Sequence, residues 1–221
     1  MSLRCKVAWE LSVLALLTAG FLVTFPKRSL PTDLGLAALA LAIIGLTRKY
    51  TKAVVWAGSA PSFDGGRFQL CAALTLMITL PVMVLFLMLG VITGYKAGGW
   101  PGVASRILNW HSLVAFACYL PWALAQQTLF QFYLLGRLLA LFPKTVPFVS
   151  IAITGLAYSL VHLPDIWSTL VTAGAGVVWS WLYCRYRVLL PLAASHAALG
   201  TTFYYWVCGR DLFDAWRSSI A

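Results

Sequence analysis

Charged residues are scarce in this chain of 221 residues: they make up 10% of it, whereas 61% of its residues are hydrophobic. A soluble globular domain carries about 25% charged residues, so the composition excludes that class and indicates an integral membrane protein. Acidic residues are scarcer still, with six against sixteen basic residues, and Glu10 is the only glutamate. The basic residues form short clusters between apolar runs, which is typical of membrane-protein loops and argues against a nucleic-acid partner.

Cysteine is sparse and widely spaced. The five cysteines are odd in number and include no C-x-x-C pair. They therefore predict neither a disulfide framework nor a zinc site, and two histidines without a carboxylate or thiolate would bind zinc poorly. We expect no metal and no other cofactor.

Long apolar runs predict an all-α, polytopic transmembrane helix bundle, because barrel strands would alternate between apolar and polar residues. The sequence predicts about seven spans, at residues 7–25, 30–46, 68–95, 107–136, 146–163, 166–183 and 188–207. A kink is expected at Pro81 and a loop over residues 96–106. A break near Pro121 would split the fourth run and give eight spans.

The distribution of basic residues predicts the orientation of the chain. With seven spans, ten of the sixteen Lys and Arg residues fall on the same side as the N-terminus. The positive-inside rule then places the N-terminus in the cytoplasm. We expect the protein to lie in the cell (inner) membrane.

Polar side chains inside the spans are the candidates for function, because they are costly in a bilayer. Gln127 and Gln131 are four residues apart and share a helical face, which Gln126 flanks. His162 and His196 lie on two later spans. These five residues could be hydrogen-bonding glue between helices, or they could converge on one polar site.

The same helical spacing extends the two histidine faces. Tyr158 lies one turn before His162, and Gly200 lies one turn after His196. Three helices could thus each turn one polar face toward a shared site.

Three segments, "QQTLFQ", "YSLVH" and "HAALG", resemble in order and spacing the motifs of the CPBP (CAAX protease and bacteriocin-processing, or Abi) family of intramembrane proteases. That family is marked by E-E-x-x-x-R, F-x-x-x-H and H-x-x-x-N on successive helices. The alignment puts Gln126 and Gln127 at the glutamates, Gln131 at the arginine, and His162 and His196 at the histidines.

The resemblance implies a division of the chain and a set of roles. It gives N-terminal helices over residues 1–106, a protease-like core over 107–206 and a short polar tail over 207–221. It also implies that a motif glutamate activates water, while the histidines and the asparagine position it and stabilise the oxyanion. Gly200 stands at the asparagine position, and Arg137 matches a second basic position.

The chain departs from this pattern at the general base. Glutamine has no proton-accepting site of useful basicity, and loss of a general base typically costs about 10²- to 10⁴-fold in rate. No other glutamate can substitute unless Glu10 reaches the site.

Two functions follow, and the sequence leaves both open. One is a divergent intramembrane protease that cleaves C-terminally processed, prenylated or otherwise hydrophobic membrane peptides. Its base would be His162 or His196, aided by another residue, the candidates being Asp165, Cys118, Ser159 and Ser195. The other is an inactive pseudoprotease that binds a peptide or a membrane partner in an immunity or accessory role. A transporter ranks lower because no acidic relay is evident. Both leading functions imply a hydrophobic or membrane-anchored peptide or protein as partner, within the lipid bilayer.

Overall fold

The computed structural model describes residues 3–24, 64–142, 147–163 and 165–211, with isolated positions between 35 and 46. These residues form helices joined by turns and contain no strand, which confirms the predicted all-α class. The predicted second span, residues 30–46, falls largely outside the described residues, as does the tail beyond residue 211.

Two helical runs within the described ranges are long and apolar enough to cross a membrane. They are Gly65–Ile107, of 43 residues, and His111–Leu141, of 31 residues. Pro147–Leu160 is apolar but shorter. Together with the composition, these runs support a membrane protein, while the count of seven spans stays a prediction.

Helix α4 (Gly65–Ile107) begins at Asp64, whose side chain accepts a hydrogen bond from the Arg67 backbone N–H at 2.9 Å. The helix is interrupted at Gly98 and Gly99, where Gly99 has a φ of 64° that favours glycine, and not at the expected position, Pro81. The chain folds back at this interruption. The expected loop over residues 96–106 is therefore helical on both sides of a two-residue turn.

The reversal in α4 requires glycine at its contact point. A Cβ added to Gly102 would lie 2.4 Å from the carbonyl oxygen of Gly94. The two arms of α4 can thus meet only because neither residue has a side chain there.

The fourth predicted run is one continuous helical stretch. It consists of α5 (His111–Gln127), the π-helix η1 (Thr128–Leu134) and α6 (Leu135–Leu141). Pro121 lies inside α5, so the run is not broken at this residue as the eight-span alternative required. π-Helical segments are rare and often occur at functional sites, and this one contains Gln131.

The described helices form two compact units, each described by itself. Unit 1 comprises chiefly residues 1–60 and 129–184, and unit 2 comprises chiefly residues 61–128 and 185–219. Each unit thus combines segments from before and after residue 106. The division into N-terminal helices and a protease-like core at this residue stays a prediction.

Unit 1 contains α1 (Leu3–Thr24), α6, α7 (Pro147–Leu160) and most of α8 (Ile166–Tyr186). Helix α6 packs against both α1 and α7. Helices α7 and α8 approach closely at Gly155 and Gly176, where a Cβ on Gly155 would lie 2.6 Å from Cγ2 of Val177. Small residues at such contacts are the usual means by which helices associate in membranes.

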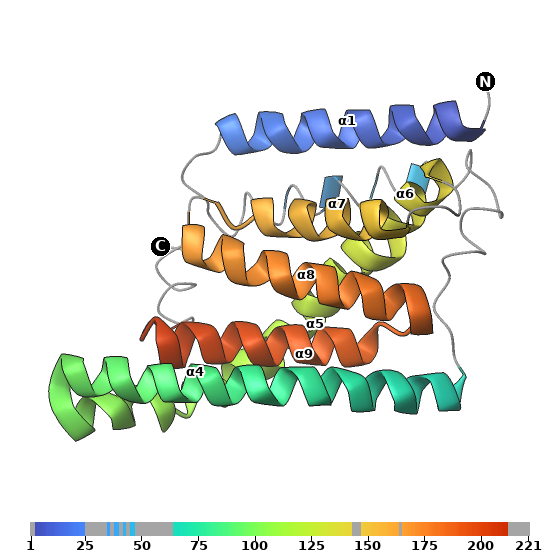
Figure 1. Cartoon of the computed structure of the whole chain (residues 1–221). Coiled ribbons are helices and arrows are strands. Elements are labelled where there is room, and N and C mark those ends of the chain that lie inside the picture. The colour runs from blue at the N-terminus through green and yellow to red at the C-terminus, as the bar shows by residue number, and fades with distance from the viewer. Residues whose placement is uncertain are drawn as a thin grey trace. The chain divides into compact units, whose positions relative to one another are not determined.

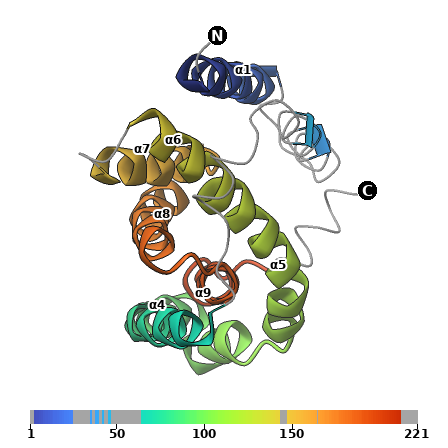
Figure 2. The same cartoon turned by 90° about the vertical axis from the view of Figure 1, so that its right-hand side faces the viewer.

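Unit 2 contains α4, α5, α9 (Leu190–Thr202) and the π-helix η2 (Phe203–Val207). Helices α4 and α9 run side by side (Figure 1), and α9 lies between α4 and α5 (Figure 2). A core joins α5 to α9, formed by Ala123, Ala193 and Ala197 with the partly buried Phe116, Tyr119 and Leu120. The hydroxyls of Thr79 and Ser195, 2.7 Å apart, link α4 to α9.

Candidate functional site

The motif glutamines carry buried polar atoms that have no hydrogen-bond partner among the described residues. Gln127 and Gln131 are each 0% exposed, and neither amide nitrogen nor amide oxygen has a hydrogen-bond partner among the described residues. The Oε1 atom of the half-buried Gln126 is likewise unpartnered within those residues. An unsatisfied buried polar group costs about 1–3 kcal/mol. The described helices thus do not provide the hydrogen bonds that the glue hypothesis requires.

In unit 1, Glu10 reaches the motif-bearing run. Its Oε1 atom accepts hydrogen bonds from the Tyr133 hydroxyl and, at 3.3 Å, from Nε of Arg137. The guanidinium of Arg137 also lies 4.7 Å from the centre of the Tyr133 ring. Arg137 is completely buried and Glu10 is 3% exposed, so the two charges are paired away from solvent.

His162 lies in a turn, which corrects the expected helical position. Helix α7 ends at Leu160, and the His162 backbone N–H donates to the carbonyl of Ser159 at 2.9 Å. The imidazole still neighbours Tyr158, with ring centroids 6.1 Å apart. Tyr158 in turn contacts Phe130, in η1, with ring centroids 4.8 Å apart. Within unit 1, a chain of ring contacts therefore leads from η1 to His162.

In unit 2, the imidazole of His196 contacts a residue that the sequence did not indicate. Its Nε2 atom lies 3.0 Å from the Tyr119 hydroxyl, and the two rings meet edge to face at 5.3 Å between centroids. His196 is 3% exposed. Tyr119 belongs to no motif, so no feature of the sequence indicated it.

The other candidates for a catalytic role have structural contacts or face outward. Asp165 begins α8, because its carboxylate accepts hydrogen bonds from the backbone and hydroxyl of Ser168, at 3.2 and 3.0 Å. Ser159 donates to the carbonyl of Leu156 at 2.8 Å, and Ser195 contacts Thr79. Cys118 is exposed on α5. None of these contacts joins a candidate nucleophile to His162 or His196.

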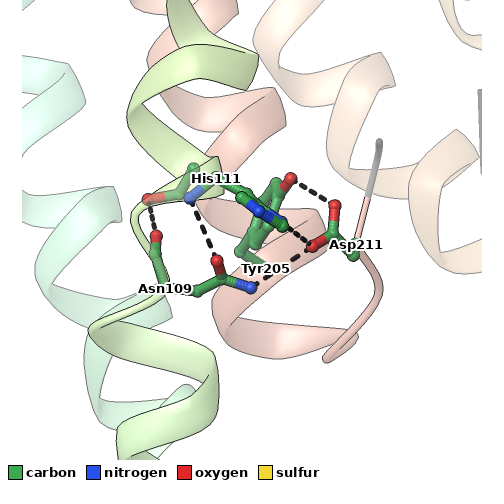
Figure 3. Close-up of polar contacts among 5 residues, drawn as sticks. Asn109, His111, Tyr205 and Asp211 are labelled. Carbon is green, nitrogen blue, oxygen red and sulfur yellow. Dashed lines mark hydrogen bonds and ion pairs between the residues drawn. The ribbon is translucent and has the colours of Figure 1, made fainter. Parts of the chain in front are cut away.

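A further polar cluster, in unit 2, was missed by the sequence analysis. Asp211 receives hydrogen bonds from the Tyr205 hydroxyl at 2.7 Å and the Asn109 amide at 3.4 Å, and it pairs with Nδ1 of His111 at 2.7 Å (Figure 3). Close by, Arg106 donates to the carbonyls of Trp206 and Val207 at 3.4 and 3.0 Å. The contacts of Asp211 tie the residues after η2 to the start of α5, and those of Arg106 tie the end of α4 to η2. No motif in the sequence indicated them.

The predicted site residues divide between the two units. Gln126, Gln127 and His196 lie in unit 2, while Gln131 and His162 lie in unit 1. A single site that joins all five stays a prediction. No group of three or more His, Cys, Asp or Glu side chains that could hold a metal occurs within the described ranges.

Part of the chain matches a known protein family. Residues 108–202 match the family model described as type II CAAX prenyl endopeptidase Rce1-like. The match is consistent with a member of the CPBP family and confirms the resemblance carried by the three motifs. No curated protein and no solved structure matches the chain. The helical fold, the apolar runs and this match support a membrane protein with a segment similar to the CAAX prenyl endopeptidases.

Proposed function

We propose that the chain binds a hydrophobic, membrane-anchored peptide through the amides of its motif run and does not hydrolyse it. The observation that carries this proposal is the complete burial of Gln127 and Gln131 without partners in the described part of the chain. Polar groups buried at such a cost are expected where a ligand completes their hydrogen bonds.

The chemistry of the primary amide fits a peptide ligand. A glutamine side chain offers both donors and an acceptor, which complement the C=O and N–H of a peptide bond. The same amide cannot remove a proton from water, so the motif lacks a general base at these positions. The description of the matched family as CAAX prenyl endopeptidase-like supports the choice of a peptide with a prenylated C-terminus as the ligand.

A capture experiment tests binding. The protein in lipid nanodiscs is photocrosslinked to a farnesylated peptide that carries a photoreactive group, and wild type is compared with Gln127→Leu and Gln131→Leu. We expect each variant to lose capture. Gln69→Leu, at an exposed position of α4, is the matched control and should capture normally.

The stability of the same variants separates a binding role from a structural one. If the amides serve a ligand, each leucine substitution removes two unpartnered polar atoms from the interior. The free energy of unfolding in detergent should then stay equal or rise by about 1–3 kcal/mol. Lower stability with unchanged capture would show that the amides hold the helices together and would contradict the proposal.

Mass spectrometry of the peptide tests the absence of hydrolysis. Wild type should return the peptide uncut, and cleavage by wild type that is lost in His196→Ala would overturn the binding-only function. The double variant Gln126→Glu/Gln127→Glu restores the carboxylates. Cleavage by this variant would show that the fold still supports proteolysis once a base is present.

Hydrolysis is the second candidate, and Glu10 favours it. This carboxylate lies against the motif-bearing run in unit 1, and its Oε2 atom is buried with no hydrogen-bond partner among the described residues. A carboxylate so placed could take a proton from water as the motif glutamate does in the family. If Glu10 is the base, Glu10→Gln should abolish cleavage while capture of the peptide persists. Equal cleavage by wild type and Glu10→Gln would exclude Glu10 as the base.

A further inference from the structure

The contact between Tyr119 and His196 joins two helices of unit 2 at a motif histidine. The Tyr119 hydroxyl lies 3.0 Å from Nε2 of His196, across the interface between α5 and α9. Both side chains come from the same compact unit, and His196 is almost completely buried. A hydrogen bond to one imidazole nitrogen fixes the orientation of the ring.

Gly200 makes this contact possible. A Cβ at position 200 would lie 3.0 Å from Cε1 of Tyr119 and 3.7 Å from its Cδ1 and Cζ atoms. The first distance is tighter than an ordinary van der Waals contact, so a side chain there would displace the ring. The phenol thus occupies the space that a side chain at position 200 would need.

We propose that Tyr119 is a positioning residue for His196, and that the absence of a side chain at Gly200 leaves room for the Tyr119 ring. The Tyr119 hydroxyl holds the imidazole in one orientation for the bound peptide. In the motif pattern, an asparagine at position 200 would stand on the same helix as the histidine, whereas here the polar group comes from α5. The role of the imidazole toward a peptide rests on the proposed function, but its fixation by Tyr119 does not.

A simpler interpretation is that Tyr119 only fills space. Its ring packs against the alanine core of Ala123, Ala193 and Ala197, which would need an aromatic ring but no hydroxyl. Tyr119→Phe separates the two interpretations, because it retains the ring and removes only the oxygen.

Nitrogen NMR of histidine rings provides the test. The chain has three histidines, so ¹⁵N-histidine labelling gives three sets of ring signals, and His111→Ala and His162→Ala assign the set of His196. We expect Tyr119→Phe to shift the His196 Nε2 signal and to leave thermal stability close to that of wild type. Tyr95→Phe, at an exposed tyrosine of α4, is the control and should leave the signal in place.

A second variant tests whether the contact between Tyr119 and His196 requires glycine at position 200. Gly200→Ala should displace the Tyr119 ring and shift the same His196 signal. Gly174→Ala is the matched control, because a Cβ there meets nothing within 4 Å. If Tyr119→Phe leaves the His196 signal unchanged, the hydroxyl does not position the ring and the proposal is overturned, whatever Gly200→Ala does.

Capture of the farnesylated peptide links the contact to function. Loss of one positioning hydrogen bond, worth about 1 kcal/mol, should weaken binding about fivefold in Tyr119→Phe. The two proposals fail separately. A wild-type protein that captures no peptide refutes the proposed function and leaves the NMR result intact, whereas normal capture by Tyr119→Phe with no shift of the His196 signal refutes the role of Tyr119.

Discussion

The two units bury polar side chains in different ways. Unit 1 buries a pair of opposite charges, Glu10 and Arg137, with a nitrogen–oxygen distance of 3.3 Å. Unit 2 contains buried hydrogen bonds between neutral groups, such as the one between the hydroxyls of Thr79 and Ser195 at 2.7 Å. These two buried contacts therefore differ in what a single lost partner would leave behind, which is an unpaired ion for the pair in unit 1 and an unpaired hydroxyl for the pair in unit 2.

This difference shows where the charge of the motif-bearing run is balanced. The motif has amides where the family has glutamates, yet Arg137, six residues after Gln131, remains fully buried. An arginine in apolar surroundings needs a counter-ion. Glu10, which lies outside the matched residues 108–202, is that counter-ion. The family segment thus depends on α1 for its charge balance.

Breaking the ion pair should have the largest effect. Removal of one partner of a buried pair leaves an unpaired charge and typically costs about 3–5 kcal/mol. Glu10→Gln and Arg137→Gln should each lower the free energy of unfolding by about this amount, measured by denaturation in SDS–detergent mixtures.

The double variant Glu10→Gln/Arg137→Gln sharpens this prediction. With neither charge present, we expect it to be more stable than either single variant, because a neutral pair of similar shape avoids the unpaired ion. Additive losses would mean that the two side chains act independently, and the difference between the units would then not be one of charge.

The Thr79–Ser195 contact should have a smaller effect. Hydrogen bonds between membrane helices average about 0.6 kcal/mol and reach about 1.7 kcal/mol. Thr79→Val and Ser195→Ala should each lower stability by about this amount in the same SDS assay. A double-mutant cycle isolates the coupling of the pair. Coupling as large as that of Glu10 with Arg137 would remove the distinction between the units.

The class of fold and the position of the helices could be predicted from the sequence, because long apolar runs directly record the helices of a membrane protein. The turn within α4 was misplaced because Pro81, a residue that commonly breaks helices, fits the helix interior. The reversal instead occurs at Gly98 and Gly99, and it brings Gly94 into contact with Gly102. That contact exists only in three dimensions.

The candidate site could be predicted only as a list of residues. The spacing of the motifs indicated Gln127, Gln131, His162 and His196, but a one-dimensional pattern does not show which groups have partners. Tyr119 was missed because it lies outside every motif and reaches His196 across a helix interface, 77 residues away in sequence. Glu10 was noticed as the only glutamate, and the packing of α1 against α6 gives it a partner.

Asp64 carries an exposed charge outside the membrane-spanning segments, in contrast to the buried charge of Glu10. We expect its contribution to stability to be the smallest of those considered. Its exposed carboxylate caps α4, and the hydrogen bond from the Arg67 backbone N–H lowers its pKa below the ordinary value. A lowered pKa means that the stabilisation is complete above the ordinary carboxyl pKa and is lost as the pH falls through the lowered value.

Asp64→Asn keeps an acceptor at the N-cap but cannot titrate, so it provides the matched reference. We expect wild type and Asp64→Asn to melt at similar temperatures at neutral pH, and wild type to become slightly less stable than the variant as the pH is lowered through the carboxyl range. A difference that does not change with pH would show that the Asp64 charge contributes nothing to the cap. The loss of stability at low pH should be much smaller than the loss caused by Glu10→Gln, because solvent screens an exposed carboxylate. A loss of equal size would contradict the view that burial makes the Glu10–Arg137 pair the more important charge.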